Sequence, residues 1–282
     1  MGTLTDPTTT NNRAPEANVR SLPHVAALVA FAAATVFLIP LKLFVPGVAS
    51  WLVTLALIVA SGDRVLRRNM SVLLVCIAVL AAAPIHTELS TRHFIGIGIP
   101  FFVVTAGPFL FMRWRAPGEV VWRFWPREFS LRDLIYTIIS IPLAWGIIWV
   151  YFFHLTPEMP TQWPMPAEHD MGMVRRLVIG INCVGIWDEL FFVNTVYLLL
   201  RRLYPAWLAN LGQSVVYTSV LYTMAFVGAG PAIVYFFALT QGVMYEKSRV
   251  LLYVLLVHLI VDAFLVFAIL QYYYPGSSLT VF

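Results

Sequence analysis

The chain has 282 residues, of which 60% are hydrophobic and only 11% are charged. This composition excludes an ordinary soluble domain, in which about 25% of the residues are charged. The net charge of +4 does not indicate nucleic-acid binding, because the basic residues lie in short segments between apolar runs. The cysteines Cys76 and Cys183 both lie within apolar runs, so no disulfide framework is predicted. The sequence therefore predicts an integral membrane protein.

Residues 1–22 are polar and lack apolar periodicity, which predicts a disordered cytosolic tail. The apolar run 24–41 has no cleavage region after it, so it is expected to be an uncleaved first span. Further spans are predicted at 47–61, 70–86, 94–112, 134–154, 173–200, 207–228, 230–245 and 250–273. Because 47–61 and 230–245 are short for a bilayer that needs about 20 residues, eight or nine transmembrane helices are expected. The predicted fold is an all-α, polytopic membrane helix bundle.

The basic residues give the expected orientation. With nine spans and a cytosolic N-terminus, all lysines and arginines lie in cytosolic segments except Lys42, Arg92, Arg175 and Arg176, and the positive-inside rule favours this arrangement. The C-terminus then lies outside, and the expected location is a bacterial plasma membrane. The segment 113–133 mixes arginine with tryptophan. This mixture is typical either of a plain basic loop or of a segment lying on anionic lipid headgroups.

Two carboxylates, Asp188 and Glu189, are adjacent near the middle of the predicted span 173–200. An ionisable side chain at that depth costs about 2.5–3.5 kcal/mol on insertion scales, and such residues usually have a function. His258 and Asp262 lie four residues apart in the last span, so they share one helix face. A carboxylate beside an imidazole orients the ring for acid–base work or anion stabilisation. A purely structural pair is the alternative in both places.

The order and spacing of these residues resemble the CPBP family, the CAAX-protease and bacteriocin-processing group of intramembrane endopeptidases. The family pattern is Glu-Glu-x-x-x-Arg, then Phe-x-x-x-His, then His-x-x-x-Asn/Asp. The matching segments of this chain are Asp188 to Val193, Tyr222 to Phe226, and His258 to Asp262. The resemblance covers roughly residues 173–273. It implies a CPBP-like core over residues 134–282, preceded over 23–133 by N-terminal spans and a basic cytosolic segment.

The resemblance implies that Asp188, Glu189, His258 and Asp262 form the catalytic set, without a metal or another cofactor. In the family, the first acid and the middle histidine are thought to activate water, and the last pair stabilises the oxyanion. This chain departs from the pattern at several motif positions: a shorter acid at Asp188, and Val193, Tyr222 and Phe226 in place of Arg, Phe and His. Loss of one acid–base group typically lowers the rate by about 10²–10⁴-fold.

Three functions stay open at this point. The first is a degenerate, inactive or weakly active CPBP homologue that acts as a binding subunit for another integral membrane protein, a prenyl or acyl chain, or a lipid-handling complex. The second is an active CAAX-type endopeptidase, with Asp188 or Glu189 as the base and His258 with Asp262 at the oxyanion. The third is a proton-coupled transporter with Glu189 and His258 as a relay, which the lack of an internal repeat disfavours. No zinc site is predicted, because the chain has no His-Glu-x-x-His motif.

Overall fold

A computed structural model describes residues 22–222, 224 and 227–276. Within these ranges the chain forms helices and connecting segments, without a strand. The first five long helices are α1 (Leu22–Leu38), α2 (Phe44–Ala60), α3 (Arg64–Ala82), α4 (Thr91–Arg115) and α5 (Leu131–Val150). A continuous helical stretch follows, made of α6 (Met171–Asp188), the π-helical segment η3 (Glu189–Val196) and α7 (Tyr197–Arg201). The last three helices are α8 (Ala206–Tyr222), α9 (Gly230–Ser248) and α10 (Leu251–Tyr273), and two short turns, η1 (Tyr151–Leu155) and η2 (Met159–Gln162), follow α5.

Five of the described helical stretches are long and apolar enough to cross a membrane: Arg64–Ala82, Thr91–Arg115, Leu131–Leu155, Met171–Arg201 and Leu251–Tyr273. The helices α1 and α2 are apolar but have only 17 residues each. The prediction of an all-α fold is therefore confirmed for the described residues, and these five stretches overlap spans predicted from the sequence. Several boundaries differ from the sequence prediction. The helix α3 begins at Arg64 and ends at Ala82, whereas the predicted span is 70–86, α8 already ends at Tyr222, and α9 continues to Ser248.

Short polar side chains begin four of the helices. The side chains of Asp63, Ser90, Ser130 and Asp170 accept hydrogen bonds from backbone N–H groups in the first turn of α3, α4, α5 and α6. Such caps satisfy donors that the first turn of a helix leaves without an intrahelical partner. They also define where each apolar helix begins, and this sets the level at which its side chains lie.

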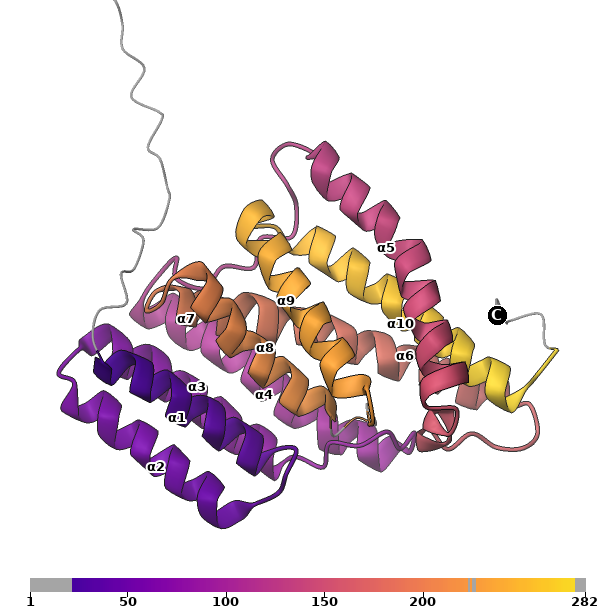
Figure 1. Cartoon of the computed structure of the whole chain (residues 1–282), viewed down its shortest axis with the longest axis horizontal. Helices are drawn as coiled ribbons and strands as arrows, with labels where there is room; N and C mark the ends of the chain where they lie inside the picture. Colours follow the sequence, from indigo (N-terminus) through magenta and orange to yellow (C-terminus); the bar gives the residue numbers. More distant parts are fainter. Residues whose placement is uncertain (1–21, 223, 225–226, 277–282) are drawn as a thin grey trace, which may run out of the picture.

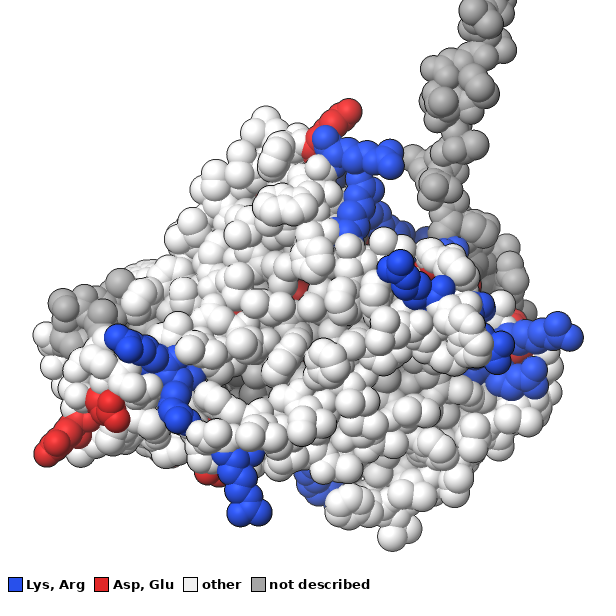
Figure 2. Space-filling model, turned by 180° about the vertical axis from the view of Figure 1, so that it is seen from behind, with Lys and Arg blue, Asp and Glu red and all other residues white. Residues whose placement is uncertain are grey.

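Polar contacts join the basic connections at one end of the bundle. These contacts link Arg68 to Glu119 (2.5 Å), the amide of Leu251 to the carbonyl of Arg123 (2.8 Å), and Arg201 to Glu246 (3.1 Å). At the opposite end, Arg176 donates to the carbonyl of Leu89. Figure 2 shows charged side chains gathered toward the ends of one face, with a broad and mostly uncharged surface between them. The helices therefore run between two polar ends separated by an apolar band.

The segment η3 lies at the centre of the bundle. It packs against α4, α6, α7, α8, α9 and α10, and all eight of its residues are buried. The pair of α1 and α2 lies at one side of the molecule, whereas α5 and α10 lie at the other (Figure 1). One hydrophobic cluster nevertheless extends from Ala27 in α1 to Val257 in α10. The central position of η3 surrounds its first residue, Glu189, with other helices on every side.

Candidate functional site

Glu189 and His258 form the closest polar contact of the site. The Oε1 atom of Glu189 lies 2.7 Å from Nδ1 of His258, and both side chains are buried. The hydroxyl of Tyr217 in α8 lies 3.0 Å from the same ring nitrogen, and the amide of Gln241 in α9 donates to the carboxylate at 3.2 Å. Four helical segments thus supply one hydrogen-bonded cluster. The structure thus brings Glu189, one of the two adjacent carboxylates, within hydrogen-bond distance of His258.

The other ring nitrogen of His258 faces Asp262. Its Nε2 atom lies 3.5 Å from Oδ1 of Asp262, one helical turn further along α10. Gly185 in α6 allows this pair to approach closely, since a Cβ at that position would lie 3.0 Å from the His258 ring and would overlap the Asp262 carboxylate. The close approach of α6 and α10 therefore depends on glycine at residue 185.

Asp188 is placed differently from its neighbour. Its side chain is 1% exposed, and neither carboxylate oxygen has a hydrogen-bond partner among the residues that the structure describes. Successive residues of a helix point about 100° apart, because a turn contains 3.6 residues. Glu189 consequently points into the bundle, whereas Asp188 lines a cavity together with His258 and Asp262. The two adjacent acids are thus separated into a paired one and an unpaired one.

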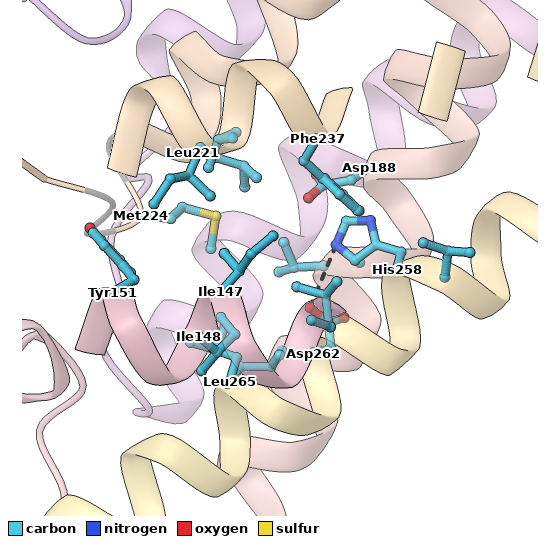
Figure 3. Close-up of a pocket in the computed structure, with 18 of the residues that line it drawn as sticks. Ile147, Ile148, Tyr151, Asp188, Leu221, Met224, Phe237, His258, Asp262 and Leu265 are labelled. Carbon is cyan, nitrogen blue, oxygen red and sulfur yellow. Dashed lines mark ion pairs between the residues drawn. The ribbon is translucent and has the colours of Figure 1, made fainter. Parts of the chain in front are cut away.

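The cavity has a volume of about 950 Å³ and is lined mainly by α4, α5, α6, α9 and α10 and by the connection before α4. Figure 3 shows Asp188, His258 and Asp262 grouped on one side of it, while apolar side chains such as Leu221 and Met224 lie on the other. Ligand sites are typically concave and mostly apolar, with a few polar groups that fix the orientation of the ligand. This cavity has that composition, and it reaches the polar cluster at the centre of the bundle.

The substituted motif positions have different environments. Val193 is fully buried in the hydrophobic core, and Tyr222 at the end of α8 is 38% exposed and does not line the cavity. Phe226 lies outside the described residues, although its near neighbour Met224 lines the cavity. His154 packs against Trp149 (ring centroids 4.3 Å apart) and is not one of the cavity residues. No second imidazole in the described part of the chain therefore joins His258 at the polar cluster.

Sequence reasoning missed two residues of the site, and it treated a third only as a general hydrogen-bonding group. Tyr217 lies four residues after Gln213, on the same face of α8, so a polar stripe was present in the sequence. Gly185 lies three residues before Asp188, also on a shared face, and this spacing could have indicated a close helix contact. Gln241 is a polar residue of the predicted span 230–245 and could form a hydrogen bond to another helix, but its contact with Glu189 depends on how α9 packs, which the spacing along the chain does not reveal.

The arrangement has three carboxylates and one imidazole at the centre of the bundle. One imidazole can balance the charge of only one carboxylate, so the site favours a bound group that donates hydrogen bonds or carries positive charge. The π-helical turn that begins at Glu189 is a rare conformation that occurs frequently at functional sites. In comparisons with known proteins, no family model, no curated protein and no solved structure matches this chain.

Proposed function

We propose that the chain is a CPBP-like membrane protein whose cavity binds the apolar chain of a lipid-modified or lipid-like ligand, and that it hydrolyses peptides weakly or not at all. The observation that supports this function best is the apolar cavity of about 950 Å³ that ends at Asp188, His258 and Asp262. The apolar walls would hold a prenyl or acyl chain. The polar end would receive the group attached to that chain.

The sequence supports binding over hydrolysis. His258 is the only histidine after His169, so the region of the family resemblance has one imidazole where the family has two. The Nδ1 atom of that imidazole is already engaged by Glu189 at 2.7 Å. A base that activates water must lie within hydrogen-bond reach of it, and Asp188 has no imidazole partner among the described residues that could share this work. Loss of such an acid–base group costs about 10²–10⁴-fold in rate.

The charge of the site restricts the class of ligand. Asp188 and Asp262 lie at the cavity wall, and both carboxylates have an oxygen without a hydrogen-bond partner among the described residues. A buried oxygen of this kind gains about 1–3 kcal/mol when it finds a donor. A ligand head with an amide, hydroxyl or amine would supply that donor, whereas a phosphate or carboxylate head would be repelled. The favoured ligand is therefore a prenyl or acyl chain joined to a neutral or cationic head, as in a lipidated peptide of a partner membrane protein.

The proposed topology follows from the basic residues. The end of the bundle that holds Arg68, Arg123 and Arg201 would face the cytosol of a bacterial cell, because basic connections favour that side. Nine passes are proposed: the five stretches that are long and apolar enough to cross a membrane, the shorter helices α1 and α2, and the helices α8 and α9. The N-terminal tail, of which residues 1–21 lie outside the described residues, would then be cytosolic, and the C-terminus would lie outside.

Crosslinking tests the binding proposal directly. An acyl amide with a photoreactive diazirine in its chain should label the purified protein in mild detergent. Gly146→Leu should reduce the labelling several-fold, because Gly146 lines the cavity and a Cβ there meets open space. Gly107→Leu is the matched control, since Gly107 also has nothing within 4 Å but lies away from the cavity. Equal labelling of both variants would contradict the proposal, and so would a fatty acid that labels better than its amide.

An intramembrane endopeptidase is the second candidate function. It is favoured by Asp188, which lines the cavity with both carboxylate oxygens unpartnered among the described residues. The purified protein should be incubated with a prenylated peptide, and the products should be analysed by mass spectrometry. We expect no cleavage above background. Robust cleavage that is lost in Asp188→Asn would establish the endopeptidase and exclude the binding-only function.

A further inference from the structure

A second polar cluster lies at another part of the cavity wall. It consists of His86 and Glu88 in the connection between α3 and α4, and of His93 in the first turn of α4. Their ligand atoms all lie within 4.8 Å of one another. His86 and Glu88 are exposed, whereas His93 is 6% exposed. Two imidazoles and one carboxylate are a donor set that suits zinc and similar divalent transition metals.

Hydrogen bonds already orient the buried histidine. The Nε2 atom of His93 lies 2.8 Å from the backbone carbonyl of His86, so this nitrogen donates its proton and leaves the Nδ1 lone pair free. The hydroxyl of Ser90 accepts a hydrogen bond from the backbone N–H of His93 at 3.2 Å, which holds the start of the helix. A metal-binding histidine usually donates its other ring N–H to a carbonyl or carboxylate in this way.

The other two side chains can adjust to a bound ion. The rings of His86 and His93 are stacked with their centroids 3.8 Å apart, and the backbone N–H of Glu88 donates to Nδ1 of His86 at 3.4 Å. The Nε2 atom of His86 is therefore the ring nitrogen available to a metal. Because His86 and Glu88 are exposed, both can rotate without disturbing the core. Only the ring of His93 must be oriented before the metal binds, and its hydrogen bond to the carbonyl of His86 provides this orientation.

The cluster is separate from the site at Asp188. Phe94, which follows His93, packs against Gly180 in α6. Asp188 lies eight residues further along the same helix, which is about 12 Å along the helix axis. His86, Glu88 and His93 nevertheless line the same cavity as Asp188.

We propose that His86, Glu88 and His93 bind one divalent transition-metal ion of the zinc class at the wall of the cavity. Three protein ligands leave at least one coordination position open, as in metal sites that bind a further ligand. Since all three residues line the cavity, that position would be available to a ligand inside it. The metal site does not depend on the proposed binding of a lipid-like ligand.

The test uses the full-length protein purified without a histidine tag. Zinc is titrated in competition with a chromogenic chelator, and cobalt is titrated with the visible absorption of its complex as the signal. We expect one equivalent of metal per chain. Glu88→Gln and His86→Ala should each weaken the binding at least about ten-fold, and His93→Ala should abolish it. The matched controls are Glu168→Gln and His169→Ala, which change exposed residues of another connection and should leave the affinity unchanged.

Thermal unfolding provides a readout that does not depend on the titration. Zinc should raise the Tm of the wild type, because a ligand that binds only the folded state stabilises it. The same zinc concentration should raise the Tm of His86→Ala less than that of the wild type, although this exposed substitution should fold normally without metal. The proposal is overturned if wild type and Glu88→Gln bind zinc equally, or if the wild type binds less than one equivalent.

Discussion

The two adjacent carboxylates should respond in opposite ways to the same chemical change. Glu189→Gln removes the charge that accepts hydrogen bonds from His258, Gln241 and Tyr217 at 2.7, 3.2 and 3.4 Å. Asp188→Asn changes a carboxyl group that has no hydrogen-bond partner among the described residues. Both substitutions keep the shape of the side chain and convert an acid to an amide. Each is therefore the control for the other.

The hydrogen bonds of the two carboxyl groups give the expected changes in unfolding free energy and Tm. A hydrogen bond to a charged group contributes about 1.5–3 kcal/mol, so Glu189→Gln should lower the free energy of unfolding by about that amount. For a chain of roughly this size, 1 kcal/mol shifts the Tm by about 2–4 °C, which gives an expected decrease of about 3–12 °C. Asp188→Asn loses no hydrogen bond to the described residues. Its Tm should be unchanged or higher, while labelling by the acyl amide should fall several-fold.

Both variants can be measured side by side in one detergent by thermal unfolding and by photocrosslinking. The reasoning is refuted if Asp188→Asn lowers the Tm as much as Glu189→Gln does. That result would mean that Asp188 is a paired structural residue and that the cavity does not use it. A stable Glu189→Gln would equally contradict the contacts that join η3 to α8, α9 and α10.

Three further predictions test the packing, one cap and the topology. Gly185→Ala should destabilise the protein by about 1–3 kcal/mol, because the added Cβ would overlap the Asp262 carboxylate. Gly146→Ala is the control and should leave the stability unchanged, because its Cβ would meet no atom within 4 Å. Thermal unfolding compares the two variants. Burial acts to raise the pKa of Asp63, but hydrogen bonds from the N–H groups of Leu66 and Val65 and the nearby His24 lower it overall. Asp63→Ala should therefore lower the free energy of unfolding by about 0.5–2 kcal/mol at pH 7. This difference from the wild type should disappear as the pH falls below the lowered pKa, because the protonated carboxyl group no longer caps α3. Equal differences in unfolding free energy at pH 7 and pH 3 would contradict this prediction. Single cysteines introduced at Arg127 and Thr161 should be labelled from opposite sides of the membrane, and labelling of both from the same side would exclude the proposed orientation.

Much of the fold could be predicted from the sequence, because a helix in a bilayer must satisfy its backbone internally and must be about 20 apolar residues long. The span predicted at 173–200 lies within the helical stretch Met171–Arg201, and the span predicted at 250–273 corresponds to Leu251–Tyr273. Helix ends were harder to predict. The chain leaves α8 at Tyr222, although the apolar composition continues to residue 228. Hydropathy reports which residues tolerate lipid, and it does not report where backbone hydrogen bonding changes.

The site could be predicted only in part. His258 and Asp262 share a face because of their spacing, so their proximity required nothing beyond helix geometry. The sequence could not decide which of Asp188 and Glu189 faces His258, because that depends on the rotation of α6 and η3 in the bundle. The cluster of His86, Glu88 and His93 also escaped the sequence analysis. Its residues match no familiar metal motif, and they come together through a turn before α4 whose conformation is not encoded in a simple spacing.

Under the proposed CPBP relationship, the valine at residue 193 and the pairing of Glu189 with His258 have one joint explanation. The family motif has an arginine at the position of Val193, where it is expected to neutralise the second acid. In this chain Val193 is buried in the hydrophobic core, and His258 pairs with Glu189 at 2.7 Å. Under this proposed relationship, His258 would supply the charge balance that the arginine supplies in the family motif. An imidazole held in this way has one nitrogen committed to structure, and only the Nε2 side, next to Asp262, remains toward the cavity. Under the proposed function, this pairing leaves a site better suited to holding a ligand than to hydrolysing one.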